Sequence, residues 1–90
     1  MAIEVRIPTI LRTYTNGEKS VTAEGGDLSA LIDDLEANHP GIKDRLIDGG
    51  ELRRFVNVYI NDEDVRFIGS LEAGLSDGDQ VVVLPAVAGG

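Results

Sequence analysis

The chain has 90 residues, with 16 acidic and 8 basic side chains and a formal net charge of −8. Its length fits one domain, and its charge predicts no nucleic-acid or membrane partner, because phosphate groups would be repelled on average. The acidic charge serves either solubility or docking to a basic partner, whose encounter long-range attraction would speed. The absence of cysteine excludes thiol catalysis and thiolate metal sites in this chain and fits a reducing cytoplasm, where we expect the protein to reside.

The first part of the chain predicts an antiparallel hairpin. Residues 2–7 alternate apolar and polar side chains, which indicates a strand with one buried face. Pro8 ends this strand, and Asn16-Gly17 marks a turn that favours positive φ. Residues 19–24 alternate in the same way and predict the second strand.

A helix is predicted after this hairpin. Asp27 is placed to act as its N-cap, because a carboxylate can accept the unpaired amide groups of the first turn. Pro40-Gly41 ends the helix, and the spacing of Ile42 and Leu46 suggests a short second helix. The apolar stripe of the main helix has the spacing i, i+3, i+4, i+7 and consists of Leu28, Leu31, Ile32 and Leu35.

Three further strands are predicted in the second half of the chain. They cover residues 53–60, with Val56, Val58 and Ile60 facing inward, the short return strand 65–67, and the last strand 80–84. A helical crossover between two hairpins lets the first and last strands pair in parallel at the sheet centre. The predicted fold is therefore α+β, a β-grasp (ubiquitin-like) domain with a mixed sheet of four to five strands and one main helix packed on one face.

Only small residues follow the last strand. We expect a β-grasp domain over residues 1–84 and a flexible C-terminal tail over 85–90 that ends in a free carboxylate. Gly89-Gly90 lacks Cβ atoms, so a partner could close a narrow slot around this backbone and reach the terminal carbonyl.

No side chain indicates catalysis or metal binding. His39 lies beside Pro40 at a helix end, where a solvated or capping role is expected. The acidic group at 62–64 lacks the glycine and the distal glutamate of a calcium loop and is interpreted as solvated turn residues. In the turn 77–79, Gly78 supplies a positive φ, and the carboxylates of Asp77 and Asp79 are expected to bond nearby amides.

The last strand suggests a docking patch. If Val81 and Val83 point inward, then Leu84 points to the sheet face opposite the helix. Phe55 and Tyr59 share this outward parity on the third strand. We predict that Leu84, with Phe55 and Tyr59 as weaker candidates, contacts a partner that handles the terminus.

The C-terminal motif is Gly78-Asp79-x-Val81-x-x-Leu84-Pro85-x-Val87-Ala88-Gly89-Gly90. It resembles the C-terminal signature of the ThiS/MoaD family of ubiquitin-like sulfur carriers. Residues 7–12, 34–38 and 54–66 resemble the CysO branch of this family, whose carriers serve cysteine synthesis. MoaD proteins usually have two prolines before the tail, whereas Ala86 stands here at the second position.

The resemblance implies a protein cosubstrate and not an enzyme. An E1-like enzyme would adenylate the carboxylate of Gly90 with ATP, and sulfur would then displace AMP to leave a thiocarboxylate. Val87, Ala88 and Gly89 would thread the partner enzyme. A PLP-dependent cysteine synthase would take the sulfur, and a zinc metallopeptidase would release the cysteine. The carrier itself would bind no cofactor.

Other functions remain open at this point. A ubiquitin-like modifier, whose terminal glycine forms isopeptide bonds with lysines, would begin with the same adenylation. A MoaD-type small subunit of molybdopterin synthase would hold its tail in a stable complex with a catalytic subunit. A structural domain with an accidental Gly-Gly end is the remaining alternative.

Overall fold

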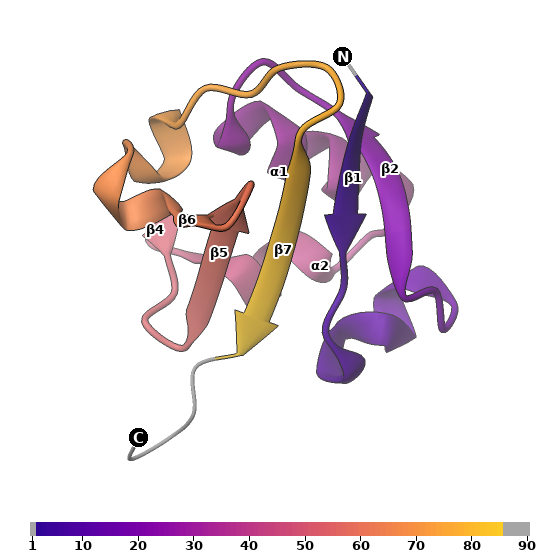
Figure 1. Cartoon of the computed structure of the whole chain (residues 1–90). Coiled ribbons are helices and arrows are strands. Elements are labelled where there is room, and N and C mark those ends of the chain that lie inside the picture. The colour runs from indigo at the N-terminus through magenta and orange to yellow at the C-terminus, as the bar shows by residue number, and fades with distance from the viewer. Residues whose placement is uncertain (1, 86–90) are drawn as a thin grey trace.

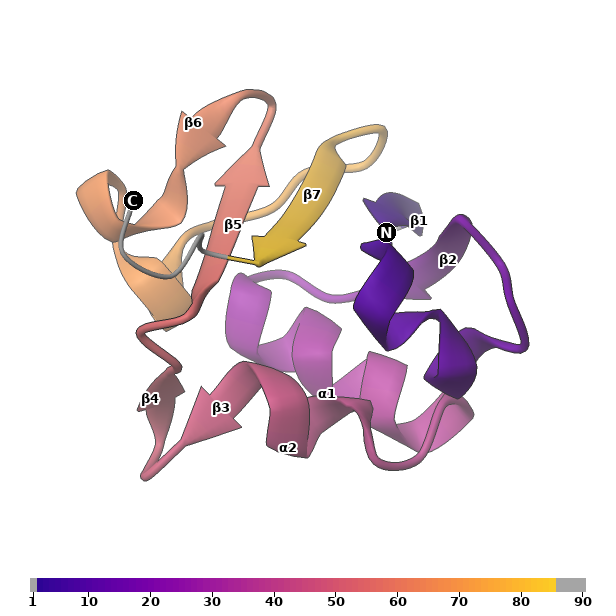
Figure 2. The same cartoon turned by 90° about the horizontal axis from the view of Figure 1, so that it is seen from below.

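Two strands from opposite ends of the chain, β1 (Ala2–Arg6) and β7 (Gln80–Pro85), lie in parallel at the centre of the sheet (Figure 1). The computed structural model describes residues 2–85. Its main sheet has five strands in the order β2-β1-β7-β5-β6, and the helices cover one face (Figure 2). The predicted β-grasp fold is confirmed.

The first hairpin pairs β1 with β2 (Ser20–Glu24) over five residues of each strand. Its connection contains a 3-10 helix, η1 (Thr9–Thr15), where the sequence indicated only a turn. The predicted turn follows this helix, with Asn16 at φ 55° and Gly17 at φ 83°. Residues 9–15 therefore form a folded lobe beside the end of β1.

The crossover is helix α1 (Leu28–Asn38), which begins where the sequence predicted. The carboxylate of Asp27 accepts a hydrogen bond from the amide of Ala30 at 2.8 Å, so the predicted N-cap is confirmed. The predicted second helix is α2 (Ile42–Leu46). It is tied to α1 because Glu36 accepts hydrogen bonds from the amides of Gly41 and Lys43.

The second half of the chain departs from the prediction in two places. Strand β5 (Val56–Ile60) starts three residues later than expected, because the amide of Val56 bonds the carbonyl of Arg53 in a turn. The predicted return strand 65–67 is wrong. The return strand is β6 (Glu63–Asp64), and residues 65–67 form the 3-10 helix η2 (Val65–Phe67), because the Asp64 carboxylate caps the amide of Arg66.

Three further elements have no counterpart in the sequence analysis. They are the two-residue strands of a separate small hairpin, β3 (Ile47–Asp48) and β4 (Glu51–Leu52), and the 3-10 helix η3 (Ser70–Glu72). Elements of two or three residues are too short to show a hydrophobic period, so periodicity could not predict them.

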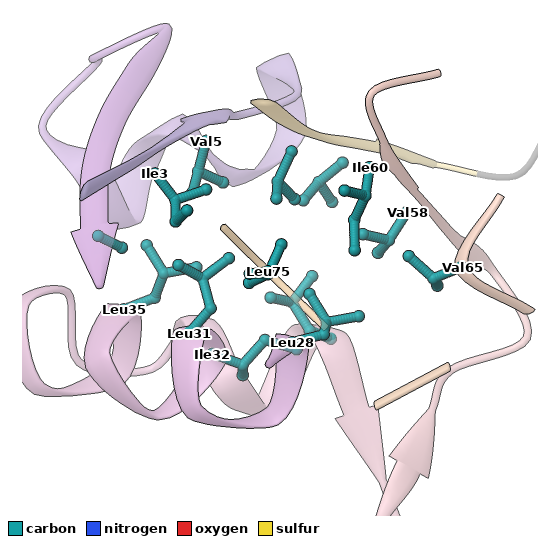
Figure 3. Packing of buried hydrophobic residues seen from close by; sticks show 14 of the residues in the cluster. Ile3, Val5, Leu28, Leu31, Ile32, Leu35, Val58, Ile60, Val65 and Leu75 are labelled. Atoms are coloured by element: carbon teal, nitrogen blue, oxygen red, sulfur yellow. The ribbon is translucent and has the colours of Figure 1, made fainter. Parts of the chain in front are cut away.

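The core lies between the sheet and α1 (Figure 3). All four residues of the predicted helix stripe are buried, as are the three inward residues predicted for β5. Strand β7 alternates as predicted, with Val81 and Val83 in the core. The sheet contributes the aliphatic side chains of Ile3, Val5, Val56, Val58, Ile60, Val81 and Val83.

Candidate functional site

The C-terminal end of β7 is the part of the described chain nearest to the terminus in sequence. Leu84 is 46% exposed on the face away from α1, whereas its neighbour Val83 is buried. Pro85 is the last paired residue and lies opposite Val56 of β5. The pairing with β1 ends at Val82, and the pairing with β5 continues to Pro85, five residues before Gly90.

Two adjoining hollows flank this end of β7, and together we call them the tail-end groove. The larger, of about 460 Å³, lies toward β1, and the smaller, of about 220 Å³, lies toward α2 and the start of β5. Residues common to both linings come from η1 with its preceding residue and from β7: Pro8, Ile10, Val83, Leu84 and Pro85.

The structure brings two of the three predicted docking residues together. Leu84 and Phe55 both line the smaller hollow, and Phe55 is 69% exposed. Tyr59 lies elsewhere on the same sheet face, paired with Val82, and it lines neither hollow. The docking role of all three residues stays a prediction.

Ile10 belongs to the same surface, although no pattern in the sequence predicts it there. Its side chain is 67% exposed and lines both hollows with Leu84. A single isoleucine in a connection expected to be irregular gives no periodic signal. Only the folding of η1 beside β7 brings it to the groove.

Arg66 fixes the position of Phe55. Its Nη2 donates hydrogen bonds to the carbonyl oxygens of Arg53 at 3.0 Å and Val56 at 2.7 Å, and its Nη1 bonds Asn57 at 3.1 Å. These contacts bracket Phe55 on both sides in sequence. Arg66 thus orders the backbone that carries an exposed aromatic side chain at the groove.

The predicted reactive and threading residues, Val87, Ala88, Gly89 and Gly90, lie outside the described residues. Covalent geometry alone limits where Gly90 can act. Five residues beyond Pro85 span at most about 18 Å when fully extended. An enzyme acting on the terminus must therefore place its reactive groups within that distance of the end of β7.

The acidic turns bond to backbone amides, as predicted for 77–79. The Asp77 carboxylate accepts a hydrogen bond from the amide of Ala2, and the Asp79 carboxylate accepts one from the amide of Ser76 at 2.8 Å. The hydrogen bond from the Ser76 amide lowers the pKa of Asp79 below its ordinary value, and a hydrogen bond from the Asn61 side chain adds a smaller effect in the same direction. Among residues 2–85, no three potential metal ligands are grouped closely enough to hold an ion.

His39 lies at the C-cap of α1, where its amide bonds the carbonyl of Leu35 at 2.7 Å. It lines neither hollow of the tail-end groove. None of the helices in the described part of the chain has the length and apolar character needed to cross a bilayer.

Known proteins resemble this chain over its whole length. The sequence pattern of the ThiS family matches residues 5–90, which include the C-terminal Gly-Gly. "Sulfur carrier protein CysO" of Mycobacterium tuberculosis is 59% identical, with 100% of both chains covered. "Small archaeal modifier protein 3" of Haloferax volcanii is 34% identical, again with 100% of both covered.

A solved structure agrees with these sequence matches. In the crystal structure of the Amycolatopsis orientalis BexX/CysO complex, a chain 61% identical to this one superposes with a TM-score of 0.94, covering 99% of this chain and 100% of that one. The chain therefore belongs to the ThiS family of β-grasp sulfur carriers, and it resembles the CysO members of that family from end to end.

Proposed function

We propose that this protein is a sulfur carrier for cysteine biosynthesis, loaded at the carboxylate of Gly90. The observation that carries the proposal is the identity of 59%, over the full length, to a protein named a sulfur carrier. The match to the ThiS family agrees with it and extends through Gly90. The protein acts as a cosubstrate of other enzymes and contributes its terminus to the chemistry.

The chemistry requires activation of the terminus. A carboxylate is a poor electrophile, so attack of its oxygen on the α-phosphate of ATP forms an acyl adenylate and releases pyrophosphate. A sulfide equivalent then attacks the acyl carbon, the bond to AMP breaks, and a thiocarboxylate remains at Gly90. ATP is bound and consumed by the enzyme, and the side chains of this chain serve to bind and orient.

The partner enzymes form the finer part of the proposal. An E1-like adenylating enzyme loads the sulfur, a PLP-dependent cysteine synthase accepts it, and a zinc metallopeptidase releases the product. Each must receive the same terminus, so each must approach the end of β7 within about 18 Å. Leu84 and Phe55 at the tail-end groove, with Tyr59 farther along the face, are the residues proposed to dock them.

A second candidate function has its own support. The identity of 34% to a protein named a small archaeal modifier favours conjugation of Gly90 to lysines of target proteins. Both functions begin with adenylation and differ in the acceptor. A single free species in cells indicates a carrier, whereas a ladder of conjugates indicates a modifier.

The test is intact-mass analysis of the protein isolated from its own cells. We expect replacement of one terminal oxygen by sulfur, or an added cysteine. Deletion of Gly90 should abolish both, because reacting atoms must approach to about 3–3.5 Å and the carboxylate moves by one residue. The control His39→Ala should load normally. Normal loading of the Gly90-deleted protein, or loss of loading in a folded His39→Ala variant, would refute the sulfur-carrier proposal.

A further inference from the structure

Basic side chains gather at the tail-end groove of this acidic protein. Five of its eight basic residues line the two hollows, whereas no acidic residue lines either one. A random distribution in a chain with 16 acidic residues would place more acidic than basic groups there. The lining residues are Arg6, Arg12 and Lys19 in the larger hollow, and Arg45 and Arg53 in the smaller one.

Most of this positive charge is not neutralised within the described chain. Arg6 and Lys19 are exposed and make no side-chain hydrogen bond or ion pair within residues 2–85. The Nε of Arg12 donates a hydrogen bond to the carbonyl of Ile7 at 3.1 Å, and the Nε of Arg45 donates one to the hydroxyl of Tyr14 at 2.7 Å. Both acceptors are uncharged, so these two guanidinium groups keep their full positive charge.

Arg53 is the exception among the five. Its Nε donates to the carbonyl of Asp44 at 2.8 Å, and its Nη1 lies 4.0 Å from the Asp48 carboxylate. The positive charge is therefore strongest on the β1 side of the groove, where Arg6 and Lys19 form no ion pair with any residue from 2 to 85.

The opposite end of β7 is acidic. Asp79 precedes this strand, and Glu4 pairs with Gln80 at its first residue. The Asn61 side chain donates a hydrogen bond to the Asp79 carboxylate at 2.9 Å, which brings Asp62 of the β5–β6 turn and Glu63 at the start of β6 to the same end. Positive charge at the end of β7 and negative charge at its start give the described part of the molecule a charge asymmetry along the direction of β7.

We propose that the tail-end groove binds a protein surface on which carboxylates flank an apolar side chain. The charge asymmetry of the carrier then orients it so that the end of β7 faces the enzyme. The inference rests on the proposed function, because the partner is the enzyme that receives Gly90. The exposed apolar side chains of Ile10, Phe55 and Leu84 suit an apolar contact, and the surrounding cations suit carboxylates. Carboxylates on the enzyme repel the acidic end and so disfavour the reversed approach.

A protein partner fits these observations better than a polyphosphate or a lipid surface. The formal charge of −8 repels a large anion from the molecule as a whole, and only a partner that contacts the groove locally gains from its cations. The apolar floor of the groove has no role in phosphate binding. Nucleic acid and anionic membrane are therefore alternative outcomes of the experiment.

The experiment compares the double variant Arg6→Gln/Lys19→Gln with Ala30→Glu/Ala37→Glu. Both lower the net charge by two units, but the second pair lies on exposed positions of α1, away from the groove. Neither Arg6 nor Lys19 bonds another side chain in the described part of the chain, so the groove variant should fold as the parent does. The readout is the association rate with the E1-like enzyme and the KM and kcat of adenylation, at ionic strengths of about 0.01 M and 0.15 M.

We expect the groove variant to associate about three- to tenfold more slowly at the lower ionic strength, with a raised KM and an unchanged kcat. The difference should shrink at the higher ionic strength, where the Debye length falls from about 30 Å to about 8 Å. The α1 variant should change much less, because its charges face away from the docked enzyme.

Three results would overturn the inference. One is a groove variant that matches the parent in rate and salt dependence, and another is an α1 variant that is slowed equally. The third is parent protein that binds RNA or phosphatidylglycerol vesicles at about 0.15 M salt through Arg6 and Lys19. If the parent is not adenylated at all, the proposed function fails, and that result is distinct from all three.

Discussion

At the scale of single residues, Leu84 is the proposed docking residue that lines both hollows of the tail-end groove. It is the last residue of β7 before Pro85, it is 46% exposed, and it lies between the two hollows. Its partner in the ladder is Asn57, so its backbone is fixed while its side chain is available. An exposed leucine on a paired strand is a suitable docking contact, because its backbone is already ordered and little backbone entropy is lost on binding.

Leu84→Ala should weaken adenylation without unfolding the protein. We expect a raised KM for the carrier, because an apolar contact near the centre of a docked surface contributes about 1–2 kcal/mol, roughly five- to thirtyfold. The free energy of unfolding should change by less than about 1 kcal/mol, since the side chain is half exposed. Adenylation kinetics and urea unfolding measure the two effects. Unchanged kinetics in the folded variant would remove Leu84 from the docking patch.

At the scale of elements, the approach of α1 to the end of β2 depends on a glycine. A Cβ atom on Gly25 would lie 2.5 Å from the amide nitrogen of Leu31 and 2.9 Å from its Cα. These are backbone atoms of the helix, so they cannot move aside as a flexible side chain could. The absence of a side chain at Gly25 lets α1 pack closely on the strand that precedes it.

Gly25→Ala should therefore destabilise the protein by about 1–3 kcal/mol, the cost of overpacking. Gly74→Ala is the matched control. Gly74 pairs with Asp27 in a bridge beside the same helix start, yet a Cβ there would have no atom within 4 Å. We expect its effect to stay within about 0.5 kcal/mol. Equal stabilities of the two variants in urea unfolding would show that the helix has room to shift.

The elements also show where sequence patterns succeed. The i, i+3, i+4, i+7 spacing from Leu28 to Leu35 specified α1, and the alternation from Val81 to Leu84 specified both faces of β7. The prediction of a strand at 65–67 is wrong for a local reason. Val65-Arg66-Phe67 has alternating polarity, but the Asp64 cap closes a 3-10 turn, and the exposed Phe67 belongs to that turn.

At the scale of the whole molecule, hydrogen-bonded carboxylates make stability depend on pH. The amides of Gly41 and then Lys43 lower the pKa of Glu36 from its ordinary 4.5 by bonding the ionised form. The pKa of Asp79 is lowered in the same way by hydrogen bonds from the amide of Ser76 and from the side chain of Asn61. A pKa that is lower in the folded state means that the unfolded state binds more protons as the pH falls.

The stabilisation from Glu36 is therefore complete above its ordinary pKa of 4.5 and is lost as the pH falls through the lower folded value. We expect Glu36→Gln to reduce the dependence of unfolding free energy on pH below about 4.5. Urea unfolding at a series of pH values measures the slope. The comparison is Glu63→Gln, whose carboxylate is exposed and makes no side-chain hydrogen bond within residues 2–85. An equal slope change in both variants would contradict the role of the Glu36 hydrogen bonds.

The sequence alone determined the first hairpin, the crossover helix with its Asp27 cap, the last strand, and the family signature that ends at Gly90. Local periodicity and short motifs carry these features, because each depends on residues that are close along the chain. The same reasoning found Leu84 and Phe55 as exposed apolar positions of one sheet face.

Only the tertiary structure decided what surrounds the end of β7. Arg6, Ile10 and Lys19 reach the same groove as Leu84 because β1 and β7 pair in parallel, which joins residues more than 70 positions apart. No pattern within either strand contains that register, and η1 folds beside it without a periodic signal. The tail-end groove and its positive charge are therefore properties of the fold, since long-range pairing places side chains that are separate in sequence on one surface.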